Sequence, residues 1–137
     1  MGRVINTENL ATERNRLLKA IALAVREMGK KSSYDDEARD LAAFLVLALD
    51  AIAEGVERSV LPWEKRGYWV KADRFRMDWA WAEALRTKIR AAVSGERPDE
   101  VALAAAVLAD KLKNVKVPER HRMGSPWQDA WKQMKAK

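Results

Sequence analysis

Residues 41–53, LAAFLVLALDAIA, constrain the fold of this chain more than any other stretch. Asp50 is the only polar residue in this run, and neither glycine nor proline interrupts it. A helix that is apolar nearly all the way round must be covered on several sides. Because thirteen residues are too few to span a bilayer, the run predicts a buried central helix and no membrane segment.

The residues on either side of this run predict where the central helix begins and ends. Ser33 can cap its first turn, and Asp36, three residues later, makes a carboxylate form of the capping box. Pro62 predicts its end, because the residue before a proline is disfavoured in the α region. We therefore expect a helix over residues 34–60, followed by a loop over residues 63–72.

Apolar residues recur at helical spacing in four other segments, and no segment alternates in the strand period for long enough to predict a sheet. The clearest end signals are Gly29 and Gly95 after two of these segments, Pro98 at the start of another, and Ser125-Pro126 before the last. At 137 residues the chain is predicted to be one all-α domain. We expect an up-and-down four-helix bundle with a long central second helix and a short C-terminal fifth helix. The expected helices cover residues 7–28, 34–60, 73–93, 98–114 and 126–135.

Composition argues against several kinds of chemistry. The chain has no cysteine and a single histidine, His121, so disulfides, thiolate metal sites and di-iron motifs with paired histidines are excluded. No glycine-rich phosphate loop and no serine elbow is present. The start of the chain lacks an apolar signal region. We therefore expect a cytoplasmic, non-catalytic protein with no cofactor and no metal site.

One set of carboxylates resembles a known enzyme family. Asp36-Glu37-x-x-Asp40 followed by Glu54-x-x-Glu57 is similar to the E-E-x-x-E and E-x-x-D motifs of MazG-type nucleotide pyrophosphohydrolases. That resemblance implies a Mg²⁺ site shared by two facing helices. Here an unbroken helix would instead hold Asp40 and Glu54 about 21 Å apart. Such a site would therefore need carboxylates from two subunits, and it remains a third alternative.

Basic and aromatic residues are interleaved in two parts of the chain. Residues 63–81 hold four of the six tryptophans among lysines and arginines, and residues 101–137 carry eight basic and three acidic side chains. Cations can neutralise phosphates while exposed aromatic rings stack on unpaired bases. These patterns predict nucleic acid as a partner. The expected contact residues are Lys65, Arg66, Trp69, Lys71, Arg74, Arg76, Arg86, Arg90, Lys111, Lys113, Lys116, Arg120 and Arg122.

The same tryptophans have two other interpretations. They can fill the core with arginines stacked on them, which we favour for Trp79, Trp81, Trp127 and Trp131. They can also serve as interface anchors, and Trp127, Trp131 and Met134, which share one face of the last predicted helix, are the candidates for docking on the bundle or on a partner.

In size, helicity and basic charge the chain is similar to the small helical subunits of CRISPR effector complexes, although no specific motif is shared. That resemblance implies a subunit that contacts a nucleic-acid strand through basic faces within a larger assembly. The first expectation is therefore a non-catalytic nucleic-acid-binding protein. The second, from a different class, is a self-associating or scaffold-binding bundle that acts through tryptophan-rich protein interfaces.

Overall fold

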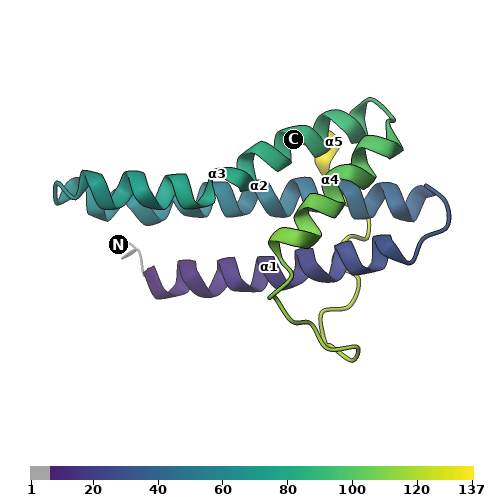
Figure 1. The fold of residues 1–137 in the computed structure, drawn as a ribbon, viewed down its shortest axis with the longest axis horizontal. Helices are drawn as coiled ribbons and strands as arrows, with labels where there is room; N and C mark the ends of the chain where they lie inside the picture. Colours follow the sequence, from purple (N-terminus) through teal and green to yellow (C-terminus); the bar gives the residue numbers. More distant parts are fainter. Residues whose placement is uncertain (1–6) are drawn as a thin grey trace.

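The computed structural model describes residues 7–137 and contains five helices (Figure 1). Helices α1, α2 and α3 run up and down along the longest axis of the molecule, and the shorter α4 returns obliquely toward its middle. This arrangement confirms the predicted all-α up-and-down bundle with a long second helix and a short fifth one. The helices are α1 (Thr7–Gly29), α2 (Asp36–Lys65), α3 (Trp69–Ser94), α4 (Pro98–Lys111) and α5 (Ala130–Ala136).

The apolar run of α2 forms the centre of the bundle. Helices α1, α3 and α5 all pack against α2, whereas α4 packs on α3 and α1. Leu41, Leu45 and Leu49, which follow one another at intervals of about one turn, are completely buried. Burying one leucine side chain contributes about 1.5–3 kcal/mol relative to leaving it exposed. The apolar run therefore forms the buried central helix that its pattern predicted.

The start of α2 differs from the prediction. Asp35, not Ser33, is the N-cap residue, and its Oδ1 accepts the backbone N–H of Ala38 at 2.9 Å. Its other carboxylate oxygen accepts a hydrogen bond from Lys31 Nζ at 2.7 Å. The ammonium of Lys31, and after it the Ala38 N–H, lower the pKa of Asp35. The predicted capping box of Ser33 and Asp36 is wrong because a carboxylate makes the stronger, charge-assisted cap.

The end of α2 also differs, since Pro62 lies inside the helix and does not end it. A proline within a helix removes one hydrogen bond and crowds the preceding turn, but its own φ is helical. Packing between α2 and α3 offsets this cost, because Val60 and Ala72 are completely buried where the two helices meet. Most of the predicted loop over residues 63–72 is therefore helical.

A tight turn at Arg66–Tyr68 joins α2 to α3. Gly67 has a φ of +79°, and its N–H donates to the carbonyl of Glu64 at 3.0 Å. The N–H of Tyr68 donates to the carbonyl of Trp63 at 2.8 Å. These two bonds form a Schellman motif, in which a glycine takes the left-handed conformation without a Cβ clash. Gly67, and not Pro62, is thus the residue that ends α2.

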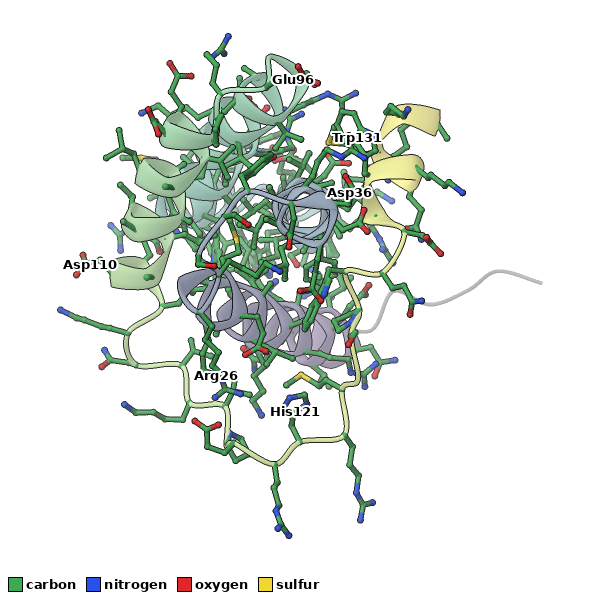
Figure 2. All side chains as sticks on the ribbon, turned by 90° about the vertical axis from the view of Figure 1, so that its right-hand side faces the viewer. Arg26, Asp36, Glu96, Asp110, His121 and Trp131 are labelled. Atoms are coloured by element: carbon green, nitrogen blue, oxygen red, sulfur yellow. The ribbon has the colours of Figure 1, made fainter. Side chains whose placement is uncertain are left out.

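Helix α4 ends at Lys111, three residues before the predicted end, and a connector over residues 112–129 follows. Leu112 is buried at this end, and the chain then turns so that Val115 and Val117 pack against the core. The connector passes along α1 on the side away from α2 (Figure 2). Arg26 of α1 holds it, donating from Nη1 to the carbonyl of Val117 at 2.7 Å.

The last helix begins at Ala130, four residues later than predicted. Residues 126–129 form turns, and Asp129 has a φ of +61°, so the predicted capping box at Ser125-Pro126-Trp127-Gln128 is wrong. Trp127 explains the difference, because its side chain is only 7% exposed and is part of the core. The turns allow Trp127 to reach the core from outside the helix.

Candidate functional site

The connected ends of α2 and α3 extend past the start of α1 and form one end of the molecule along its longest axis (Figure 1). We call residues 61–75 the hairpin tip. Large apolar side chains are exposed there: Tyr68 is 53%, Trp69 58% and Val70 74% accessible. Adjoining apolar side chains that face solvent in this way make the hairpin tip a candidate for an interaction surface.

The hairpin tip contains a groove of about 790 Å³, which we call the tip groove. Half-buried Trp63 and Phe75 contribute to it from the two helices, and their rings meet edge to face at a centroid distance of 5.3 Å. This volume is within the usual range for ligand sites, which are mostly apolar with a few polar groups. The groove is lined by Trp63, Gly67, Tyr68, Trp69, Val70, Lys71, Arg74, Phe75 and Asp78.

An aromatic row continues from the tip groove along α3. The ring of Phe75 lies 6.4 Å from that of Trp79, and Trp79 lies 5.7 Å from Trp81. Both tryptophans are half-buried and pack against the core. Their placement agrees with the interpretation that they belong to the core and its border.

Basic side chains from three helices lie over this aromatic row. The guanidinium of Arg14 on α1 lies 5.0 Å from the centroid of Phe75 and 5.1 Å from that of Trp79. Burial lowers the pKa of Arg14. Sequence reasoning missed Arg14, although its spacing from Leu10 and Leu17 places it on the apolar stripe of α1. The other two cations are Lys71, at 4.5 Å from the Trp63 centroid, and Lys111, at 5.7 Å from the Trp81 centroid.

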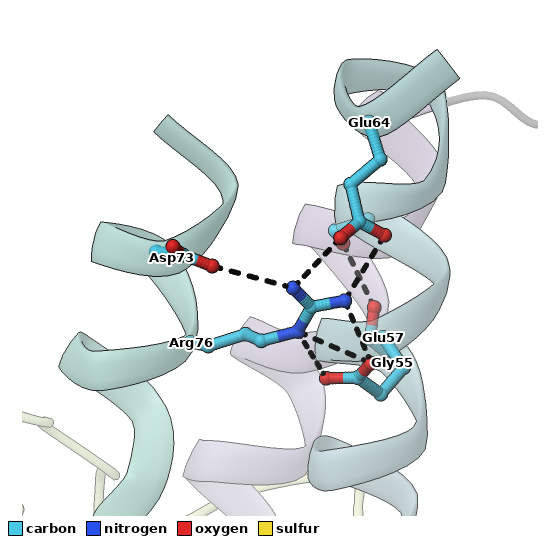
Figure 3. Close-up of polar contacts among 6 residues, drawn as sticks. Gly55, Glu57, Glu64, Asp73 and Arg76 are labelled. Atoms are coloured by element: carbon cyan, nitrogen blue, oxygen red, sulfur yellow. Dashed lines mark hydrogen bonds and ion pairs between the residues drawn. The ribbon is translucent and has the colours of Figure 1, made fainter. Parts of the chain in front are cut away.

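Arg76 is one of the predicted contact residues, and carboxylates surround it (Figure 3). Its Nη1 lies 2.9 Å from Glu64, its Nε lies 3.0 Å from Glu57, and Asp73 is 3.7 Å away. Hydrogen bonds to Glu64 and then Glu57 raise the pKa of Arg76, and the same bond lowers the pKa of Glu64. Arg76 therefore joins α3 to α2, and little of its charge is left for an outside partner.

Arg86, further along α3, also pairs with carboxylates. Its Nε lies 3.6 Å from Asp50 of α2, and its Nη2 lies 3.7 Å from Glu83. The single polar residue of the apolar run, Asp50, therefore meets an arginine of a neighbouring helix. Arg90, the next basic residue of the predicted set, is partly exposed.

The basic residues of the hairpin tip differ from Arg76 and Arg86 in their surroundings. Four of its cations are exposed, and none of them forms an ion pair with any residue in the range 7–137. In the sequence, two of them precede Tyr68 and Trp69 and two follow. These cations are Lys65, Arg66, Lys71 and Arg74.

The remaining predicted cations lie at the end of α4, where Lys111 contacts Trp81, and on the connector, which passes along the side of α1 away from α2 (Figure 2). All of them are exposed. The structure thus divides the predicted contact residues between the hairpin tip, the paired arginines of α3 and this basic connector. The basic connector group is Lys111, Lys113, Lys116, Arg120 and Arg122.

The predicted interface residues Trp127, Trp131 and Met134 pack against their own bundle. Trp127 and Met134 are buried in the core, and Trp131 is half-buried beside them. The backbone N–H of Trp131 donates to Asp40 Oδ1 at 3.0 Å, which fastens α5 to α2. Trp127 and Met134 are therefore covered by their own bundle, and Trp131 keeps part of its surface exposed.

The carboxylates that resemble the MazG motifs take part in structural contacts. Helix α2 is continuous, so Asp40 and Glu54 are separated by about 21 Å along one axis. Asp40 accepts a hydrogen bond from α5, and Glu57 pairs with Arg76. Within residues 7–137, no three acidic or histidine side chains gather in a way that could hold a metal ion.

Comparisons with protein-family models, curated proteins and solved structures found no match to this chain. In the part of the chain that the structure describes, no helix is long and apolar enough to cross a membrane.

Proposed function

We propose that this chain binds nucleic acid through the hairpin tip and acts as a non-catalytic part of a larger assembly. One observation supports this proposal above the others. At the protruding end of the molecule, four exposed cations lie before and after two exposed aromatic residues in the sequence, and none of the four has a carboxylate partner within residues 7–137. Phosphates and bases are the groups that such a combination binds together.

The absence of carboxylate partners matters because a paired cation has already lost much of its attraction for a phosphate. Arg76 is held by Glu57 and Glu64, whereas Arg66 and Arg74 have no such partner within residues 7–137. Each unpaired lysine or arginine that meets a phosphate releases condensed counterions, and this release favours binding at low salt. The basic connector adds further positive charge at a second place on the same molecule.

A specific observation also favours a second candidate, a protein partner at the same tip. Val70 in the tip and Met77 just beyond it are 74% and 77% exposed, and neither apolar side chain is suited to contact a phosphate. Tryptophan and methionine are enriched at protein interfaces. Other subunits of the proposed assembly would provide such a partner.

Electrophoretic retardation of labelled RNA and DNA over a salt series tests the proposal. The double substitution Lys65→Gln/Arg66→Gln removes two tip cations. We expect it to weaken binding at least tenfold at low salt and to reduce the slope of log affinity against log salt by about 2. The matched control Lys113→Gln/Lys116→Gln removes the same charge from the connector and should have the smaller effect.

Two results would count against this proposal. Absence of retardation for both RNA and DNA at low salt would remove nucleic acid as the partner. Equal losses for the tip and connector variants would show that binding follows net charge and not the hairpin tip. Chemical crosslinking at high protein concentration, compared between the intact chain and Val70→Ser, reports on the protein-partner alternative.

A further inference from the structure

We infer that the tip groove takes an unpaired nucleobase, so that the ligand class is single-stranded nucleic acid or a strand end and not duplex. This inference rests on the proposed function and adds the form of nucleic acid that the site selects. It follows from the shape of the groove, the chemistry of its lining and the place of its cations.

The lining of the groove is aromatic and hollow, which suits a flat base. Trp63 and Phe75 meet edge to face in the groove, and the exposed rings of Tyr68 and Trp69 also line it. A nucleobase offers a π-face that stacks on such rings whatever its sequence. In a duplex both faces of each base are covered by the neighbouring pairs, so only an unpaired base can enter.

Cations belong to the groove lining and to the residues just before it, so they are available to the phosphates of a strand whose base is in the groove. Lys71 and Arg74 belong to the groove lining, and Lys65 and Arg66 precede the turn that leads into it. Positive charge near an aromatic surface favours an aromatic ligand that carries negative charge. The same charge disfavours a quaternary ammonium ligand, which aromatic residues alone would otherwise attract.

Asp78 is expected to determine the orientation of a nucleotide bound in the groove. It is the acidic residue of the lining and comes from α3, one turn beyond Arg74. A carboxylate repels phosphate but accepts hydrogen bonds from the amino group of a base, as it does from cytosine. The bound nucleotide should therefore point its base toward Asp78 and its phosphate toward the turn at Arg66–Tyr68.

Fluorescence anisotropy with end-labelled oligonucleotides tests the inference. The probes are a twelve-nucleotide single strand and its duplex, and a nucleoside monophosphate serves as competitor. We expect the single strand to bind at least tenfold more tightly than the duplex. Trp69→Ala should weaken single-strand binding by about tenfold, since one lost base stack has an effect of this order. Trp69→Phe, which keeps an aromatic ring, should recover most of the loss.

Trp69 is largely exposed, so its variants should fold, and far-ultraviolet circular dichroism checks that they do. Equal binding of single strand and duplex, sensitive to Lys65→Gln/Arg66→Gln but not to Trp69→Ala, would overturn the groove inference and leave the proposed function standing. Loss of binding to every probe at low salt would overturn both. Displacement of the single strand by millimolar mononucleotide would support the groove and show that one nucleotide is enough to occupy it.

Discussion

The body and the tip of the α2–α3 pair are built from the same two helices, yet their basic residues have opposite surroundings. In the body, Arg76 and Arg86 of α3 each meet carboxylates of α2 within 4 Å. At the tip, less than two turns from Arg76, Lys71 and Arg74 meet none within residues 7–137. Residue type alone therefore does not separate structural cations from available ones.

The difference comes from the register between the helices. Glu57 and Glu64 are two turns apart on one face of α2, so one guanidinium on α3 can lie between them (Figure 3). Beyond Glu64 the end of α2 offers Lys65 and Arg66 instead, and the cations of α3 face no acid there. The hairpin thus concentrates paired charge in the body and unpaired charge at the tip.

The difference between the core and the tip is tested most strongly by replacing one tryptophan of each with alanine. Trp127 is 7% exposed within the core, so Trp127→Ala should lower the free energy of unfolding by about 3–5 kcal/mol. Trp69 is 58% exposed at the tip, so Trp69→Ala should change it by no more than about 0.5 kcal/mol. Urea unfolding followed by circular dichroism measures both.

The matched pair separates stability from binding. Trp127→Ala should lose stability and retain nucleic-acid affinity wherever it is still folded, whereas Trp69→Ala should do the reverse. A large loss of stability in Trp69→Ala would show that the tip is part of the core. The division between body and tip would then be wrong.

A smaller effect on stability is expected at the boundary between body and tip, where Arg76 pairs with Glu64. The hydrogen bond from Arg76 lowers the pKa of Glu64 below its ordinary value of 4.5. Since the folded-state pKa is the lower one, the stability contributed by Glu64 is present above pH 4.5 and is lost as pH falls through the folded value. Melting temperatures of the parent and Glu64→Gln should therefore differ at pH 7 and converge as pH is lowered below 4.5.

Arg76→Gln provides the control for that pH dependence, since it removes the cause of the shift and keeps the carboxylate. In this variant Glu64→Gln should have little further effect at pH 7. A gap between parent and Glu64→Gln that stays constant from pH 7 to pH 3 would show that Glu64 acts through packing and not through its charge.

The sequence predicted the parts of this molecule that depend on long apolar patterns. The run at residues 41–53 was enough to establish a buried second helix, and the bundle follows from the number and spacing of the other stripes. Pro98 at the start of α4 also fulfilled its local prediction. These features are averages over many residues, so no single tertiary contact can reverse them.

The predictions that were wrong relied on the local preference of a single residue, which its tertiary surroundings overrode. Pro62 is a strong local stop, but burial of the residues around it kept α2 helical. The capping pattern at Ser125 was overridden because Trp127 is buried from a turn. The pairing of Arg76 with two acids could not be predicted, because the register between α2 and α3 depends on where the hairpin turns.

The turn at Arg66–Tyr68 can be compared with the turn at the other end of α3, where we expect the smallest changes in stability. There Glu96 takes the left-handed position with a φ of +52°, and the N–H of Arg97 donates to the carbonyl of Ala92 at 2.9 Å, again in a Schellman pattern. Glycine fits this backbone without strain, so Glu96→Gly should stabilise the chain by a few tenths to about 1 kcal/mol. Gly67→Ala at the tip should destabilise it by about 1 kcal/mol, since no side chain blocks the added Cβ and only the φ of +79° opposes it.

Opposite signs in thermal unfolding would show that the two turns share one backbone requirement, met by glycine at the tip and left unmet at Glu96. The same sign for both would mean that the Glu96 side chain makes a contribution of its own.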